Sequence, residues 1–131
     1  MHDQLKIGID IHGVIDAYPE RFKKLTAVLV AGGAQVHIVT GSRRDKNIDI
    51  MLAKHEITFT HYFSIVDYLV STGKDVTWKN GKPYADETAW NNAKRDYCQS
   101  QNIDLMIDDS AIYRDTFHDI STTYLHLISK L

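Results

Sequence analysis

Residues 5–15 read LKIGIDIHGVI, a run rich in β-branched residues that leads into an acidic residue and a glycine-containing loop. Isoleucines alternate with other residues as far as position 11, and such alternation is typical of a β-strand. The segment therefore predicts a short central strand over residues 5–11 that carries Asp10 near its carboxyl end. A loop over residues 12–16 follows directly.

Helix and strand patterns alternate after this first strand. Pro19 suits the first turn of a helix, and Gly32-Gly33 ends that helix. A second apolar run at residues 36–39 breaks at Thr40-Gly41-Ser42, and helical spacing returns over residues 48–52. This β-α-β-α order predicts a parallel sheet with right-handed crossovers.

The second half of the chain contains one ambiguous segment and one clear turn. Residues 63–70 (FSIVDYLV) fit a helix or a strand, and we favour a short helix that ends before Gly73. Residues 76–84 (VTWKNGKPY) place Asn80-Gly81 between two arms, which predicts a β-hairpin with Pro83 on an edge. We expect Trp78 and Tyr84 to pair across this hairpin, although exposed aromatic residues can also stack on a base or bind a partner.

The pattern ends with a helix, a strand, a further helical turn and a last strand near residues 122–127. The helix has one face formed by Trp90, Ala93, Tyr97 and Cys98, and the strand at residues 105–107 ends in Asp108-Asp109. We therefore predict one α/β domain over residues 1–131, with a three-layer Rossmann-like parallel sheet, helices on both faces and a β-hairpin insertion near residues 76–84.

The composition limits the kinds of protein that the chain can represent. Its 131 residues fit one domain with room for only a small lid, and the formal net charge of −2 gives no general attraction to nucleic acid or membrane. A local basic patch would still allow nucleic acid as a partner. Apolar runs fall short of the about 20 residues that span a bilayer. Neither a signal-peptide pattern nor a second cysteine beside Cys98 indicates secretion, so we expect a cytoplasmic protein.

Several candidate functional residues fall at the ends of predicted strands. The carboxyl ends of parallel strands meet at one edge of a sheet, where such folds bind ligands. A carboxylate there can attack phosphorus, which makes Asp10 a candidate nucleophile. Thr40, the amides around Gly41 and the Lys94 ammonium can hold the transferring phosphoryl group. Mg²⁺ prefers oxygen ligands and few carboxylates, which Asp10 can supply together with Asp108 or Asp109.

These residues, in this order, resemble the motifs of the haloacid dehalogenase-like superfamily. The first motif of that family is a hydrophobic strand followed by Asp-x-Asp-Gly-x-hydrophobic, and residues 7–15 read IGIDIHGVI. HIVTGS at residues 37–42 is similar to the second motif, a lone lysine is the third, and LMIDDS at residues 105–110 is similar to the fourth. The gap between the first two motifs holds a single helix, so the chain resembles the capless or minimally capped branch.

The resemblance assigns a role to each matching residue. It implies an Mg²⁺-dependent phosphohydrolase or phosphotransferase with Asp10 as the nucleophile, which forms an aspartyl-phosphate. Thr40 and Lys94 would bind the phosphoryl group of a phosphorylated small molecule. Asp10, Asp108 and Asp109 would hold the metal together with the backbone carbonyl of His12. Lys82, in Gly-Lys-Pro, is the alternative phosphate-binding lysine.

One position departs from the family pattern. The phosphatases of the family have a second aspartate, which transfers protons, where this chain has His12. A histidine can do acid–base work near neutral pH, so His12 can replace the aspartate if its ring reaches the leaving group. The alternative is an attenuated or non-catalytic module that binds phosphate and metal. A signalling receiver domain is disfavoured, because receivers place paired acids after the first strand.

Other polar residues receive structural interpretations. Asp16 and Arg43 are interpreted as a cap or surface charge, although either can reach a substrate. Cys98 is expected to pack on its helix face. Five histidines lack close pairing at metal-ligand spacing, which argues against zinc: His37, His55, His61, His118 and His126.

Overall fold

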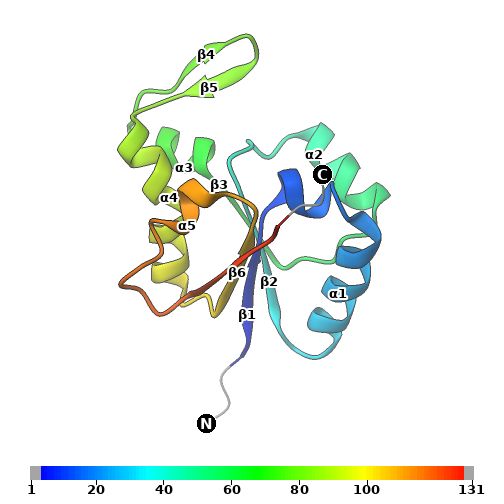
Figure 1. The fold of residues 1–131 in the computed structure, drawn as a ribbon. Coiled ribbons are helices and arrows are strands. Elements are labelled where there is room, and N and C mark those ends of the chain that lie inside the picture. Colours follow the sequence, from blue (N-terminus) through cyan, green and yellow to red (C-terminus); the bar gives the residue numbers. More distant parts are fainter. Residues whose placement is uncertain (1–3, 129–131) are drawn as a thin grey trace.

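A parallel sheet of five strands forms the centre of residues 4–128, the part of the chain described in this computed structural model (Figure 1). The strands are β1 (Lys6–Ile9), β2 (Gln35–Thr40), β3 (His61–Ser64), β6 (Leu105–Asp108) and β7 (Thr123–His126). Their spatial order is β3-β2-β1-β6-β7, and each neighbouring pair is parallel. The predicted α/β fold with a Rossmann-like parallel sheet is confirmed.

Helices cover both faces of this sheet (Figure 1). Those in the described residues are α1 (Pro19–Ala31), α2 (Lys46–Lys54), α3 (Ile65–Ser71), α4 (Glu87–Gln101) and α5 (Ala111–Arg114). One hydrophobic cluster joins the sheet to α1 and α2 through residues such as Phe22 and Leu52. A second cluster joins the other face to α3, α4 and α5 through Leu69, Ala93 and Tyr113. None of these helices is long and apolar enough to cross a membrane.

The segment that joins β3 to α3 corrects one prediction. We favoured a helix over residues 63–70, but Phe63 and Ser64 belong to β3 and the helix begins at Ile65. The Ser64 side chain accepts a hydrogen bond from the Asp67 amide, which caps the helix directly after the strand. A strand of four residues is too short for its alternation to stand out from the adjoining helical pattern.

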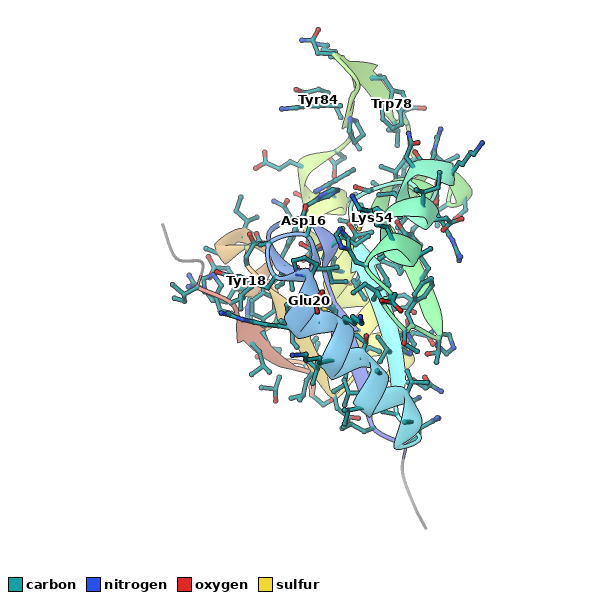
Figure 2. The ribbon with its side chains drawn as sticks, turned by 90° about the vertical axis from the view of Figure 1, so that its right-hand side faces the viewer. Asp16, Tyr18, Glu20, Lys54, Trp78 and Tyr84 are labelled. Atoms are coloured by element: carbon teal, nitrogen blue, oxygen red, sulfur yellow. The ribbon has the colours of Figure 1, made fainter. Side chains whose placement is uncertain are left out.

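The predicted hairpin is present as β4 (Thr77–Lys79) and β5 (Lys82–Tyr84), which project from the domain (Figure 1). Asn80 and Gly81 both have positive φ, as a type I′ turn requires. The pairing of Trp78 with Tyr84 is wrong, because Trp78 lies opposite Pro83 and Tyr84 lies opposite Thr77. Since side chains alternate along a strand, the two rings lie on opposite faces of the hairpin (Figure 2).

The connectivity brings distant residues to one edge of the sheet. The chain runs from β1 outward to β2 and β3, then returns to place β6 on the other side of β1. This reversal creates a topological switch point beside β1, and open α/β sheets bind ligands at the carboxyl edge there. The ends of β2, β1 and β6 lie side by side at this edge.

A buried histidine on β2 gives the fold a defined response to acid. His37 is fully buried, with Nδ1 2.6 Å from Tyr97 Oη and Nε2 2.8 Å from Gln35 Oε1. Its ring also stacks on His61, with the centroids 4.1 Å apart. Burial, aided by the charges of His61 and Lys6, lowers the pKa of His37 to about 4.

We predict that the wild type loses stability relative to His37→Gln as the pH falls from about 6.5 toward 4. The unfolded histidine takes up a proton near its ordinary pKa of about 6.5, whereas folded His37 stays neutral until about pH 4. Acid therefore favours the unfolded wild-type chain through this residue. Urea unfolding of both proteins across the pH range measures the difference, and parallel pH curves would contradict the assignment.

Candidate active site

Three of the predicted site residues lie at the ends of neighbouring strands. Asp10 directly follows β1, and its amide donates to the Ile107 carbonyl of β6 at 3.1 Å. Thr40 is the last residue of β2, and Asp108 is the last residue of β6. All three side chains are buried. The structure thus brings together residues that are far apart in the sequence, as the strand pattern predicted.

Lys94 reaches this edge from α4. Its side chain is only 1% exposed, and Nζ lies 3.2 Å from Asp10 Oδ1 and 2.8 Å from Asp108 Oδ2. The ammonium also lies 4.4 Å from the centroid of the Tyr113 ring. Lys82, the alternative lysine, is exposed on the hairpin. Of the two candidates, the structure places Lys94 at the site.

The buried charges at this edge do not balance. Burial raises the pKa of Asp10 to about 6, with Lys94 opposing the change and Asp108 adding to it. Burial alone lowers the pKa of Lys94, but the carboxylates of Asp10 and Asp108 reverse the effect and keep it protonated. Burial and the nearby Asp108 also raise the pKa of Asp109. One ammonium faces three carboxyl groups, so the cluster favours an additional cation.

The three aspartates can share a metal ion. Asp10, Asp108 and Asp109 each place a carboxylate oxygen so that these atoms lie within 4.8 Å of one another. An all-oxygen donor set of carboxylates suits Mg²⁺, so the residues present fit this metal. Gly13 helps to bring Asp109 close, because it has a φ of +81° and a side chain there would overlap the Asp109 carboxylate. The acidic pair therefore approaches the loop after β1 closely.

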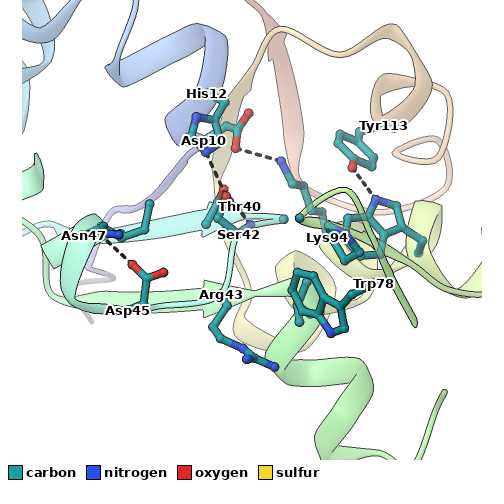
Figure 3. Close-up of a pocket in the computed structure, with 16 residues that line it drawn as sticks. Asp10, His12, Thr40, Ser42, Arg43, Asp45, Asn47, Trp78, Lys94 and Tyr113 are labelled. Atoms are coloured by element: carbon teal, nitrogen blue, oxygen red, sulfur yellow. Dashed lines mark hydrogen bonds and ion pairs between the residues drawn. The ribbon is translucent and has the colours of Figure 1, made fainter. Parts of the chain in front are cut away.

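His12 is held by two polar contacts in that loop. Its Nδ1 lies 3.0 Å from Asp16 Oδ2. Its Nε2 lies 2.9 Å from Ser42 Oγ, as Figure 3 shows. The other Asp16 oxygen accepts the Gly13 amide at 2.8 Å, which fixes the carboxylate in the turn. With 61% of its side chain exposed, the ring remains open to solvent.

Asp16 was interpreted from the sequence as a cap or surface charge, although it can reach a substrate. In the structure Asp16 contacts His12. His12 belongs to the wide turn η1 (Ile11–Ile15), and Asp16 is the residue directly after this turn. Helical spacing gave no signal for this contact, because His12 and Gly13 have non-helical backbone angles in the turn.

The turn after β2 completes the polar end of the site. The Ser42 amide donates to Thr40 Oγ1 at 3.3 Å, which orients the threonine side chain. A side chain on Gly41 would lie 3.1 Å from Trp90 Cζ2, so glycine allows α4 to pack closely on this turn. The predicted residues Thr40 and Gly41 therefore lie beside Asp10 and Lys94.

A cavity of about 620 Å³ opens over these residues (Figure 3). Asp10, His12, Thr40, Gly41 and Lys94 line one part of it. The lining also includes Ser42, whose amide adjoins Gly41, and residues that the prediction did not place in the site: Arg43, Asp45, Asn47, Ile48, Val66, Trp78, Gly81, Pro83, Trp90 and Tyr113. The cavity thus extends from the strand ends to the hairpin.

Cys98 takes no part in this cavity. It is fully buried in the second hydrophobic cluster, and burial raises the pKa of its thiol to about 12. The predicted packing role of Cys98 is confirmed.

We predict that Lys94→Met destabilises the metal-free protein by about 3–5 kcal/mol at pH 7, because it leaves buried carboxylates without their cation. The cost should shrink toward pH 5, where Asp10 can take up a proton, since its pKa is already raised to about 6 beside Lys94. Urea unfolding measures both values. Lys82→Met is the matched control, and this exposed substitution should change the unfolding free energy by less than about 0.5 kcal/mol. Equal costs for the two variants would contradict the buried charge network.

Comparisons with known proteins establish the fold and nothing finer. No protein-family model and no curated protein matches the chain. A solved structure, an uncharacterized protein from Corynebacterium glutamicum, superimposes with a TM-score of 0.58. The match covers 97% of this chain and 87% of that chain at 14% sequence identity. At this identity the likeness concerns the arrangement of helices and strands alone.

Proposed function

We propose that this protein is an Mg²⁺-dependent phosphohydrolase or phosphotransferase that uses Asp10 as its nucleophile. The observation that carries the proposal is the buried Lys94 ammonium between Asp10 and Asp108, beside Thr40 at the carboxyl edge of the sheet. The proposed membership of the haloacid dehalogenase-like superfamily belongs to the same proposal. A phosphorylated small molecule is the proposed partner, and the cytoplasm is the proposed compartment.

The first chemical step uses the Asp10 carboxylate. One of its oxygens attacks the phosphorus atom of a phosphate ester, the bond from phosphorus to the ester oxygen breaks, and Asp10 becomes an aspartyl-phosphate. Lys94, the Thr40 hydroxyl and the amides around Gly41 hold the phosphoryl oxygens during the transfer. Lys94 also keeps much of Asp10 ionised at neutral pH, because its ammonium opposes the effect of burial on the Asp10 pKa.

The second step regenerates Asp10. A water molecule attacks the phosphorus, the bond to the Asp10 oxygen breaks, and inorganic phosphate leaves. If an alcohol takes the place of water, the same step makes the protein a phosphotransferase.

The Mg²⁺ ion would be held by Asp10, Asp108, Asp109 and the His12 carbonyl. When bound, it supplies the positive charge that the carboxyl cluster lacks and offsets the repulsion between Asp10 and the phosphate.

His12 is the proposed proton donor to the leaving oxygen. His12 lines the cavity, and its Nε2 lies 2.9 Å from Ser42 Oγ. The Asp16 carboxylate accepts a hydrogen bond from Nδ1 and fixes the ring orientation. The proton moves from the imidazolium to the leaving oxygen in the first step. In the second step the neutral ring accepts a proton from the attacking water.

We predict that Asp10→Asn lowers Mg²⁺-dependent hydrolysis of 4-nitrophenyl phosphate by at least about 1,000-fold, because an amide cannot act as the nucleophile. Removal of Mg²⁺ with a chelator should abolish the wild-type activity. Release of nitrophenolate measures both effects. Asp119→Asn is the matched control, since Asp119 is exposed and its positive φ suits asparagine. Equal activity in Asp10→Asn would exclude Asp10 as the nucleophile. Binding of phosphate without turnover in the wild type would favour the non-catalytic module.

We predict that His12→Gln lowers kcat/KM, which reports the first step, by about 100-fold for an alkyl phosphate and far less for 4-nitrophenyl phosphate. Nitrophenolate leaves without a proton, whereas an alkoxide needs one, so only the alkyl ester depends on a general acid. Asp16→Asn should give the same pattern with a smaller loss, because it disturbs the ring orientation and leaves His12 in place. Steady-state kinetics on both esters measures the contrast. Uniform losses on the two esters would indicate a structural role for His12.

A further inference from the structure

The half of the cavity nearest the hairpin is aromatic and apolar. Tyr113 lies beside Lys94 and accepts a hydrogen bond from Trp90, while Trp78 and Pro83 come from the hairpin. Figure 3 shows Tyr113 and Trp78 in the cavity. Phosphate, a small and highly polar group, gains nothing from such a wall. This part of the cavity therefore fits a different portion of the substrate.

Trp90 and Tyr113 form a fixed part of this wall. The Trp90 indole N–H donates to Tyr113 Oη at 2.8 Å, and the Trp90 ring packs against Gly41. Since Lys94 lies 4.4 Å from the Tyr113 ring centroid, the aromatic wall begins directly beside the proposed phosphate position. A planar group attached to the phosphate would meet these rings.

Trp78 differs from Trp90 in its exposure. It remains 48% exposed although it lines the cavity. The Arg43 guanidinium lies 5.2 Å from its ring centroid and makes a long ion pair of 3.5 Å with Asp67. An arginine beside an exposed tryptophan provides a flat platform with a positive charge, which suits an aromatic ring that is part of an anion.

The hairpin directs Trp78 to the cavity and Tyr84 elsewhere. Because Trp78 lies opposite Pro83 and Tyr84 lies opposite Thr77, the two rings are on different faces. Trp78 and Pro83 both line the cavity, whereas Tyr84 does not line it and lies near Lys79. Figure 2 shows Trp78 and Tyr84 on different sides of the hairpin. Tyr84, at 52% exposed, thus offers an aromatic residue of similar exposure for comparison.

Polar groups face the aromatic wall. Asn47 and Asp45 line the cavity near the start of α2. An asparagine side chain offers both donors and an acceptor, which matches the mixed donor and acceptor edge of a heterocyclic base. Ribose and a base would occupy the space between the strand ends and the hairpin, and about 620 Å³ is within the usual range for small-molecule sites.

We infer that the substrate is a nucleoside monophosphate, with its phosphate at Asp10 and its base stacked on Trp78. This inference rests on the proposed function, since it assigns the leaving group of the same reaction. A mononucleotide fits better than a nucleic acid strand, because single-strand sites track the backbone with a positive groove. The cationic Lys and Arg side chains among the described lining residues are Arg43 and the buried, paired Lys94.

The test compares two substrates that differ only in the base. Adenosine 5′-monophosphate and ribose 5-phosphate carry the same phosphoester, so the ratio of their kcat/KM values isolates the contribution of the base. We expect the wild type to favour the nucleotide by at least about tenfold, and Trp78→Ala to remove most of that preference, as base stacking on aromatic residues predicts. Tyr84→Ala, on the other face of the hairpin, should keep the wild-type ratio.

A binding measurement separates this inference from the proposed function. Equilibrium dialysis of both compounds with the wild type and with Trp78→Ala, in Mg²⁺, reports recognition without turnover. Trp78-dependent binding of the nucleotide without hydrolysis would support the nucleotide as the ligand of this cavity and would overturn the proposed hydrolase activity. Turnover without a preference for the nucleotide, or with a preference that Trp78→Ala leaves intact, would overturn the inference. The proposed hydrolase activity would then still stand. Faster hydrolysis of a 5′-phosphorylated oligonucleotide than of the mononucleotide would also overturn it.

Discussion

The site depends on one buried interaction, the contact of Lys94 with Asp10 and Asp108. Two carboxyl groups at the ends of adjacent strands repel each other in a poorly solvated position, and an isolated buried charge is costly. The Lys94 ammonium lies within 3.2 Å of both groups and makes their burial tolerable. It also ties α4 to β1 and β6. The same interaction therefore compensates the buried charges and holds α4 against the sheet. The cluster still has more carboxyl groups than ammonium groups, which favours a divalent cation.

The strand order explains why this interaction forms where it does. Because β6 returns to the side of β1 away from β2, the ends of all three strands lie together. Close packing supports this arrangement at Gly8, where a side chain would lie 2.7 Å from Met106 Sδ of β6. A larger residue at Gly8 would force the Met106 side chain to move and would crowd Val39 of β2, whose Cγ2 lies 3.3 Å from the same position. Gly8 thus allows the side chains of β6 and β2 to pack closely against β1.

The sequence predicted the parts of the site that follow from local patterns. Asp10, Thr40 and Asp108 each follow a recognisable hydrophobic strand, so strand-end placement alone predicted that they would meet. Strand β3 was missed because it passes into α3 without a break in the apolar pattern. The contact of Asp16 with His12 was missed because both side chains belong to an irregular turn. The pairing predicted for Trp78 was wrong although Asn80-Gly81 sets the register. A two-residue loop pairs Lys79 with Lys82 and therefore Trp78 with Pro83, so the turn already implied that Trp78 and Tyr84 lie on opposite faces.

The two parts of the cavity differ in burial. The proposed chemical step depends on the buried part at the strand ends, and the proposed substrate selectivity depends on the exposed part at the hairpin. Lys94 and Asp108 are buried and hydrogen-bonded, so a change in either alters the charge network and the stability together. Trp78 is half-exposed on a short two-stranded hairpin and contacts Arg43. Hairpins of this size gain little stability from their own strands. In the proposed reaction, substitutions at Trp78 should therefore change which leaving group is accepted while the arrangement of Asp10, Lys94 and Asp108 persists. In a domain this small, the hairpin can supply the selectivity for which larger proteins use a second domain.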